Sequence, residues 1–406
     1  YHYQNMINLK QILNSFWIKF KKIISKMILI TNYHINNIIS HFNQKLFKLF
    51  FKRKLYNIKS LFAFNVDLRK QDGAYGWLNY IIPNINKYSK NNFKNLEDIN
   101  FKHYHDYKIE RLLIFFPQSL GYEISSKLIK SSRKIIFFVN DNVMFCKRSY
   151  NTAFNKECLK CLPKYNPYNS CDHFPYPSKD SSYIDFISTL KSKSKSILFV
   201  CHSSSHVKII NSIFPISKIF KSKHISPTFK SIKVKKNKIY KYDFLFHAHM
   251  LQSKGYFYFL KLAKANLNLK FYMPDYDLLK NFFYKNIIFD RKNWSNGLQE
   301  IIYETKIILC TSFWSANFEG SVLKTMLMGK CCAIIKNTNS FSMDIPNNSI
   351  IKLSGNLIKD SNLLKKRLKN NTEIEKMGKN ARIWAMKYIQ NNPKKEIKVL
   401  DNFLKC

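Results

Sequence analysis

The chain has few acidic residues. It carries 25 Asp and Glu against 68 Lys and Arg in 406 residues, a formal net charge of +43, and no acidic residue precedes Asp67. Such a charge favours anionic partners, namely lipid headgroups, nucleic acid or phosphorylated substrates. A general drift of composition toward Lys, Asn and Ile explains the charge equally well, so charge alone assigns no function.

Signals for membrane spans, secretion and sequence-specific nucleic-acid binding are also missing. No apolar stretch reaches the roughly 18 residues that a transmembrane helix needs. Lysines such as Lys19 and Lys22 interrupt the apolar residues near the N-terminus, unlike in a signal peptide. Zinc-finger spacing, an RRM signature and a basic zipper are all missing. We expect a cytoplasmic protein with no specific nucleic-acid partner, and polyanion binding stays as an alternative that rests on charge alone.

Nine cysteines are too few for a dense disulfide framework. Five residues of a polar, loop-like segment nevertheless have side chains that can bind a metal ion. Cys158 and Cys161 form a Cys-x-x-Cys pair with Cys146 and Cys171 on either side and His173 close by. This spacing suits a tetrahedral structural zinc. Zinc, free thiols and disulfide pairing are the alternatives, and a reducing compartment favours metal over a disulfide.

Residues 1–57 are predicted to form a basic, amphipathic helical extension. Apolar residues between Ile12 and Met27 recur three and four positions apart, while lysines fall on the other faces. Residues 45–55 also combine apolar residues with lysines and an arginine. The alternatives are contact of residues 10–55 with the anionic inner face of a membrane, and ordinary packing of the extension on the body of the protein.

From residue 58 onward, strand-like and helix-like segments alternate. This order predicts mostly parallel sheets that helices cover on both faces. We expect an α/β chain with two Rossmann-like domains that face a cleft, at 58–225 and 236–380, and a C-terminal helix at 381–406 that packs back toward the first domain. The strand-like segments are 111–117, 134–141, 196–203, 242–249, 269–275, 286–291 and 306–312.

Ligands of such sheets bind beyond the carboxyl ends of the strands. In the first predicted domain a polar loop with two glycines lies there and opens a helix, so that backbone N–H groups and the positive helix end can approach an anion. An ordinary strand-to-helix turn is the alternative for this loop. The residues at this edge are Gly73, Gly76, Asn140, Asp141, His202 and Ser203.

Three motifs in the second half occur in a characteristic order. Lys254-Gly255 follows a strand and starts a helix, "EIIYETKIILCTSFW" leads from a helix through a strand, and "EIEKMGKNARIWAMKYI" follows near the end. The order resembles that of the GT-B glycosyltransferases, a group that includes sucrose synthases and bacterial mannosyltransferases, over roughly residues 58 to 395. There the motifs read Lys-Gly, "LYxxAD" with "PSxW", and "RMGENARKRV".

The resemblance implies a glycosyltransferase that moves a sugar from a UDP- or GDP-sugar to a cell-surface glycan or a lipid-linked acceptor. It leans toward retaining chemistry, without a dedicated protein nucleophile and without a cofactor required for catalysis. No general base stands out, so no catalytic residue is assigned. Where some relatives carry His-Asp in the first domain, this chain carries Asn140-Asp141.

The donor diphosphate becomes the leaving group, so cations and helix N-termini should face it. The resemblance assigns Lys254 and Gly255 to this site and puts His249 where the family has Arg. It also aligns Ala316 and Lys324 with two glutamates of the family that lie eight positions apart.

We expect a variant donor site in the segment "NFEGSVLK". Glu319 would accept from a hydroxyl, Gly320 and Ser321 would offer backbone N–H groups at a helix start, and Lys324 would supply charge. A catalytically inactive relative that acts as a binding or scaffold protein is the alternative.

Overall fold

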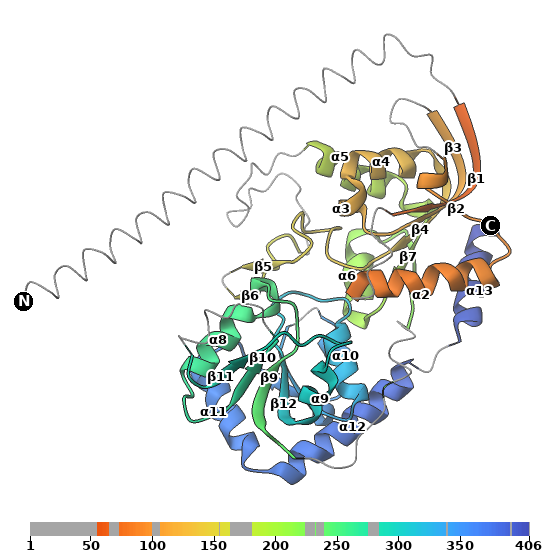
Figure 1. The fold of residues 1–406 in the computed structure, drawn as a ribbon. Helices are drawn as coiled ribbons and strands as arrows, with labels where there is room; N and C mark the ends of the chain where they lie inside the picture. The colour runs from red at the N-terminus through yellow and green to blue at the C-terminus, as the bar shows by residue number, and fades with distance from the viewer. Residues whose placement is uncertain are drawn as a thin grey trace, which may run out of the picture.

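The computed structural model (Figure 1) describes residues 55–64, 73–99, 106–153, 155–162, 181–223, 232, 239–274, 284–337, 340–389 and 392–405, without the side chains of 73–77. The predicted N-terminal extension and its membrane contact lie outside these residues, as do Cys171 and His173. Within the described residues, no helix combines the length and the apolar character that a bilayer crossing requires.

The first half of the chain forms a six-stranded parallel sheet in the order β2-β1-β3-β4-β7-β8. Alternate residues of its strands enter two cores. In β4, for example, Ile135 and Phe137 pack beneath α4, α5 and α6, while Ile136 and Phe138 pack beneath α2 and α13. The strands are β1 (Leu55–Ala63), β2 (Lys94–Asn95), β3 (Asp106–Ile114), β4 (Ser132–Phe138), β7 (Ile197–Cys201) and β8 (Lys218–Lys221).

The helices of this half follow the strands in chain order. They are α2 (Gly73–Tyr88), α3 (Pro117–Leu120), α4 (Tyr122–Lys130), α5 (Ser181–Ser192) and α6 (Ser204–Ile213), with the 3-10 turns η1 (Glu97–Ile99) and η2 (Ser194–Ser196). A small antiparallel hairpin, β5 (Thr152–Ala153) and β6 (Lys156–Glu157), lies in the cysteine-bearing segment. The helix α2 begins at Gly73 rather than at Trp77, so Gly73 and Gly76 lie in its first turn and not in the predicted loop.

The second half forms another six-stranded parallel sheet, in the order β11-β10-β9-β12-β13-β14. The helices α9, α10 and α12 cover one face, and α8 and α11 cover the other. The strands are β9 (Tyr242–Phe246), β10 (Phe271–Met273), β11 (Ile287–Phe289), β12 (Thr305–Cys310), β13 (Cys331–Ile335) and β14 (Ile351–Leu353).

The helices of this half are α8 (Tyr256–Lys264), α9 (Leu298–Tyr303), α10 (Gly320–Leu327), α11 (Leu357–Leu368) and α12 (Asn371–Ile389), with the 3-10 turns η3 (Gln252–Lys254), η5 (Phe341–Asp344) and η6 (Asn347–Ser349). Two parallel sheets, each with helices on both faces, confirm the predicted α/β class with two Rossmann-like domains.

The C-terminal segment is two helices. Ala381, Ala385 and Tyr388 of α12 join the core of the second domain. The chain then restarts at Pro393, a residue suited to the first turn of a helix, as α13 (Pro393–Lys405). In Figure 1 α13 lies beside α2 of the first domain, where Asp401 accepts hydrogen bonds from Ser89 Oγ at 2.6 Å and Lys90 N at 3.0 Å.

Candidate active site

Lys254 lies beyond the carboxyl end of β9, at the end of η3. The next residue, Gly255, has φ +83°, and a Cβ there would lie 2.2 Å from the Thr311 carbonyl oxygen. Only glycine allows both this backbone conformation and this close approach to the segment after β12. The Lys-Gly pair found in the sequence therefore lets η3 turn into α8 directly against the neighbouring strand, with Lys254 at the turn.

The Lys254 ammonium and the Glu319 carboxylate form a buried ion pair. Lys254 Nζ donates to both oxygens of Glu319, at 2.8 and 3.0 Å, and each residue is only 8% exposed. Trp314 completes the cluster. Its Nε1 donates to Glu319 Oε1 at 3.1 Å, and Lys254 Nζ lies 4.7 Å from the centre of its ring. The structure thus brings together two of the predicted donor-site residues, but as partners of each other.

Glu319 precedes α10, yet its side chain does not cap the helix. Gly320 is the first residue of α10, as expected, and Ser321 follows it. The carboxylate that would otherwise sit at this positive helix end points instead to Lys254.

Lys324 belongs to a second cluster. Its Nζ lies 4.4 Å from the centre of the Trp294 ring, and the Trp294 ring is parallel to that of His247, with 6.1 Å between the centres. His247 Nδ1 lies 3.0 Å from Thr325 Oγ1. The side chains of Lys254 and Lys324 therefore contact different tryptophans.

His247, not His249, is the buried histidine of this region. His247 is 8% exposed, whereas His249, aligned with the family's Arg, is an exposed residue. Sequence reasoning did not assign Trp314 or Trp294 to the site. Trp314 is the last residue of the motif "EIIYETKIILCTSFW", and Trp294 lies a few residues before that motif. The available signal was an aromatic residue next to a loop with Lys or Glu.

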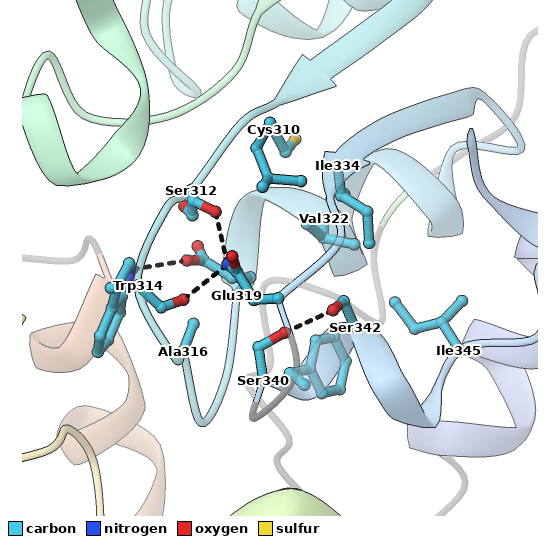
Figure 2. Close-up of a pocket in the computed structure, with 13 residues that line it drawn as sticks. Cys310, Ser312, Trp314, Ala316, Glu319, Val322, Ile334, Ser340, Ser342 and Ile345 are labelled. Carbon is cyan, nitrogen blue, oxygen red and sulfur yellow. Dashed lines mark hydrogen bonds between the residues drawn. The ribbon is translucent and has the colours of Figure 1, made fainter. Parts of the chain in front are cut away.

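A small cavity of about 20 Å³ lies behind Glu319. Figure 2 shows Glu319 bonded to Trp314 at its edge, with Cys310, Ser312, Val322 and Ile334 around it. Asn337 Nδ2 closes one wall by donating to the carbonyls of Ser312 and Trp314, at 2.8 and 3.0 Å. Such a cavity has room for a water molecule and not for a nucleotide sugar.

The segment Ser312–Glu319, which carries Trp314 and Glu319, also touches the first domain. Asn317 Oδ1 accepts from the backbone N–H groups of His202 and Ser203, at 3.2 and 3.1 Å. Ser315 N donates to Asn151 Oδ1 at 2.9 Å, and its carbonyl accepts from Asn142 Nδ2 at 2.9 Å. The candidate donor site therefore lies where the two domains meet.

Buried histidines support the first-domain side of this contact. His206 Nε2 lies 2.7 Å from Asn142 Oδ1, and its Nδ1 lies 3.0 Å from Ser203 Oγ. Burial, followed by the neighbouring His202, lowers the pKa of His206 to about 3. The ring is therefore neutral near pH 7 and acts as a hydrogen-bonding link.

Asp141 follows β4 at the carboxyl edge of the first sheet. Burial raises its pKa to about 6, against hydrogen bonds from Val143 N, Gln118 and Ser149 that favour the charged form. Gln118 Nε2 donates to Asp141 Oδ2, while Gln118 Oε1 and Asn140 Nδ2 are buried without a hydrogen-bond partner. Gln118 was not identified from the sequence.

The backbone next to this group is strained. Phe116 has φ +46°, a left-handed conformation that a bulky residue seldom adopts, immediately before α3, which carries Gln118. Strain and unpaired buried polar atoms are both features that gather at functional sites. The predicted edge residues Asn140 and Asp141 thus lie in an unusual polar group.

Cys146, Cys158 and Cys161 are partly buried, and none of them forms a disulfide within the described residues. Among the residues that the structure describes, no three His, Cys, Asp or Glu side chains are grouped so that they could hold a metal ion. Because Cys171 is outside that set, the zinc site stays a prediction. The segment itself reaches the donor site, since the Tyr150 ring packs edge-on against Trp314 at 4.6 Å.

Neither protein-family models nor curated protein sequences give a match to this chain. Solved structures do. The fold is similar to that of TarM, at a TM-score of 0.51 and 12% identity, over 73% of this chain and 55% of TarM. It is also similar to HepE of Anabaena in complex with UDP and glucose, at a TM-score of 0.51 and 10% identity, over 86% of this chain and 98% of HepE.

A third match is the GtfA/B complex, at a TM-score of 0.50 and 11% identity, over 77% of this chain and 59% of that one. The chain thus spans little more than half the length of TarM and of GtfA/B. At these identities the likeness concerns the fold alone. Its two parallel sheets, their order and these matches together show that the chain has the GT-B fold of the glycosyltransferases.

Proposed function

We propose that the protein transfers a sugar from a nucleotide-sugar donor, a UDP- or GDP-sugar, to a glycan or lipid-linked acceptor. One observation carries the proposal: a nearly buried ammonium, Lys254, lies beyond the carboxyl end of a parallel sheet and next to the other domain. In such sheets ligands bind at this edge, and a preorganised cation there suits a leaving diphosphate.

For this reaction the protein mainly has to position the two substrates and to provide positive charge at the leaving diphosphate. As the bond between the sugar and the diphosphate breaks, negative charge grows on the phosphate oxygens. Lys254 and the N-terminus of α10 at Gly320 would stabilise it, once the Glu319 carboxylate has moved aside. Retaining transfer, toward which the resemblance leans, then requires an acceptor hydroxyl on the same face of the sugar.

The acceptor would bind to the first domain. Gln118 Oε1 and Asn140 Nδ2 have unused hydrogen-bonding capacity, one as an acceptor and one as a donor. Next to them, Asp141 can accept a hydrogen bond from a hydroxyl. These three side chains suit a polyhydroxylated ligand. The basic residues of segment 10–55 would hold the protein at an anionic membrane that carries such acceptors.

A second candidate is a binding protein that shares the fold but has lost the reaction. The Lys254–Glu319 pair favours it, because the cation is already neutralised by the protein itself. The residues at the two aligned glutamate positions, Ala316 and Lys324, favour it as well.

An assay of nucleoside diphosphate release separates the two. The purified protein is incubated with UDP-glucose, UDP-N-acetylglucosamine and GDP-mannose, with and without a mixture of simple saccharide acceptors. The proposal expects release of UDP or GDP from at least one donor and its loss in Lys254→Ala. Binding of UDP or GDP without release from any donor would favour the binding protein. If the protein neither releases nor binds UDP or GDP, both proposals are refuted.

A further inference from the structure

The Asn317 side chain makes four hydrogen bonds to the other domain. It is fully buried, and its Oδ1 accepts from His202 N, Ser203 N and Ser203 Oγ, at 3.2, 3.1 and 3.2 Å, while its Nδ2 donates to the Val139 carbonyl. All of these partners belong to the first domain, at the end of β4 and the start of α6.

The same segment is fixed on both sides of Asn317. Ser315 is held by Asn142 and Asn151, and its Oγ donates to Glu157. The Ala316 carbonyl accepts from Phe341 N at 2.7 Å, and the Phe318 ring packs against that of Phe341. Glu319 comes two positions after Asn317, so its backbone has little freedom while these bonds persist.

We propose that Asn317 is a positioning residue that holds Glu319 against Lys254, so that the protein's own carboxylate occupies the donor site. The proposal rests on the function proposed above, in which the ligand of Lys254 is a diphosphate. In this proposal an entering diphosphate replaces the carboxylate, and the segment around Asn317 shifts as the carboxylate leaves. The free energy of the Asn317 bonds is then subtracted from the affinity for the ligand.

The proposal and a purely structural role predict opposite changes in the affinity for a diphosphate when Asn317 is replaced. Loss of a structural residue lowers stability and weakens ligand binding together. Loss of the Asn317 bonds lowers stability too, but it frees Glu319 and strengthens diphosphate binding. Two variants remove bonds of this segment to the first domain, Asn317→Ala and Ser315→Ala.

Asp344 provides a matched control. It also joins the domains, since its Oδ2 accepts from Ser204 N at 2.9 Å and from Lys221 Nζ at 3.1 Å, but it does so from η5, outside the segment 312–319. Asp344→Asn weakens the contact between the domains, but it leaves in place the bonds of Asn317 and the bond from Phe341 N to the Ala316 carbonyl, so Glu319 is not freed. We therefore expect it to leave the affinity for a diphosphate unchanged.

The test is calorimetric titration of the full chain with UDP and, separately, with inorganic pyrophosphate, together with urea unfolding of each variant. We expect Asn317→Ala to bind both probes about tenfold more tightly, which is about 1.4 kcal/mol. Ser315→Ala should bind a few-fold more tightly and Asp344→Asn no differently, with the urea midpoint lowered in all three.

Three other results are possible, and each of them decides for or against the proposal. If the unaltered protein binds UDP and both segment variants bind it equally or more weakly, the role of Asn317 is refuted and the donor site stands. If only Asn317→Ala or Ser315→Ala binds, the positioning role is supported in its strongest form. If no form binds either probe, the donor site and the role of Asn317 fall together.

Discussion

Lys254 and Glu319 are 65 positions apart in the chain, yet they form a buried, doubly hydrogen-bonded ion pair that joins the turn before α8 to the start of α10. Both charges have lost most of their water, and Trp314 supplies a further donor to the carboxylate. In this setting, removal of one partner leaves the other charge buried and uncompensated, which typically costs about 3–5 kcal/mol. The pair thus links the stability of the second domain to the state of the candidate donor site.

Replacement of Lys254 by Ala should lower the affinity for UDP at least tenfold, because the site loses its buried ammonium. Calorimetric titration measures the change. Lys261→Ala is the matched control, since Lys261 is an exposed lysine on the adjoining helix α8. Equal affinity of the Lys254 variant and the control would remove Lys254 from the donor site.

Replacement of Glu319 by Gln should increase the stabilisation of the protein by phosphate. The amide keeps the size of the side chain and an acceptor for Trp314, but Lys254 is left as an unpaired buried cation, and we expect a loss of about 3 kcal/mol in the free energy of unfolding. Phosphate that binds to Lys254 restores part of it. The measurement is the rise in Tm when chloride is replaced by phosphate at equal ionic strength. We expect a larger rise for Glu319→Gln than for the unaltered protein, and an equal rise would contradict the prediction.

Replacement of Gly255 by Ala should be far more damaging than the same change at Gly297. Both glycines have the left-handed conformation, with φ +83° and +81°, so an alanine at either position costs about 1 kcal/mol in backbone conformation. At Gly255 the new Cβ would also lie 2.2 Å from a carbonyl oxygen, whereas at Gly297 the nearest atom is Cδ of the flexible Lys292 side chain, at 3.3 Å. Urea unfolding should show a clearly larger loss for Gly255→Ala, and similar losses would contradict the close packing of η3 on β12.

Replacement of Asp141 by Asn should stabilise the protein at pH 8 and not at pH 4. The folded-state pKa of Asp141 is raised to about 6, so burial of the charged form costs stability above that pH, and the cost vanishes as the pH falls below the unfolded value of 3.8. We expect a gain on the order of 3 kcal/mol at pH 8. Asp185→Asn is the control, an exposed residue paired with Lys130. A destabilised Asp141 variant at pH 8 would contradict the prediction.

The alternation of strands and helices was predictable from the sequence because the central strands are largely buried on both faces and read as short apolar runs, as in "KIIFFV" and "KIILC". The turn at Gly255 and the start of α10 at Gly320 were predictable for a local reason, since both depend on neighbours in the sequence. The start of α2 was not, because residues 73–76 have no stop or cap signal that separates loop from helix.

The partners within the site could not be predicted. Glu319 was expected to accept from a ligand hydroxyl, and within the protein it accepts from Lys254. Lys324 was expected to supply charge to the donor, and within the protein its Nζ lies over the Trp294 ring. Asn317 reaches residues more than 100 positions away, in the other domain. Such contacts follow from how two sheets and their loops pack in space, and neither periodicity nor motif spacing carries that information.

A crystal structure of the protein with UDP bound tests the central claim most directly. We predict the diphosphate within hydrogen-bond distance of Lys254 Nζ and close to the N-terminus of α10, with the Glu319 carboxylate moved away from the ammonium. UDP bound elsewhere, with the Lys254–Glu319 pair intact as it is here, would contradict the account.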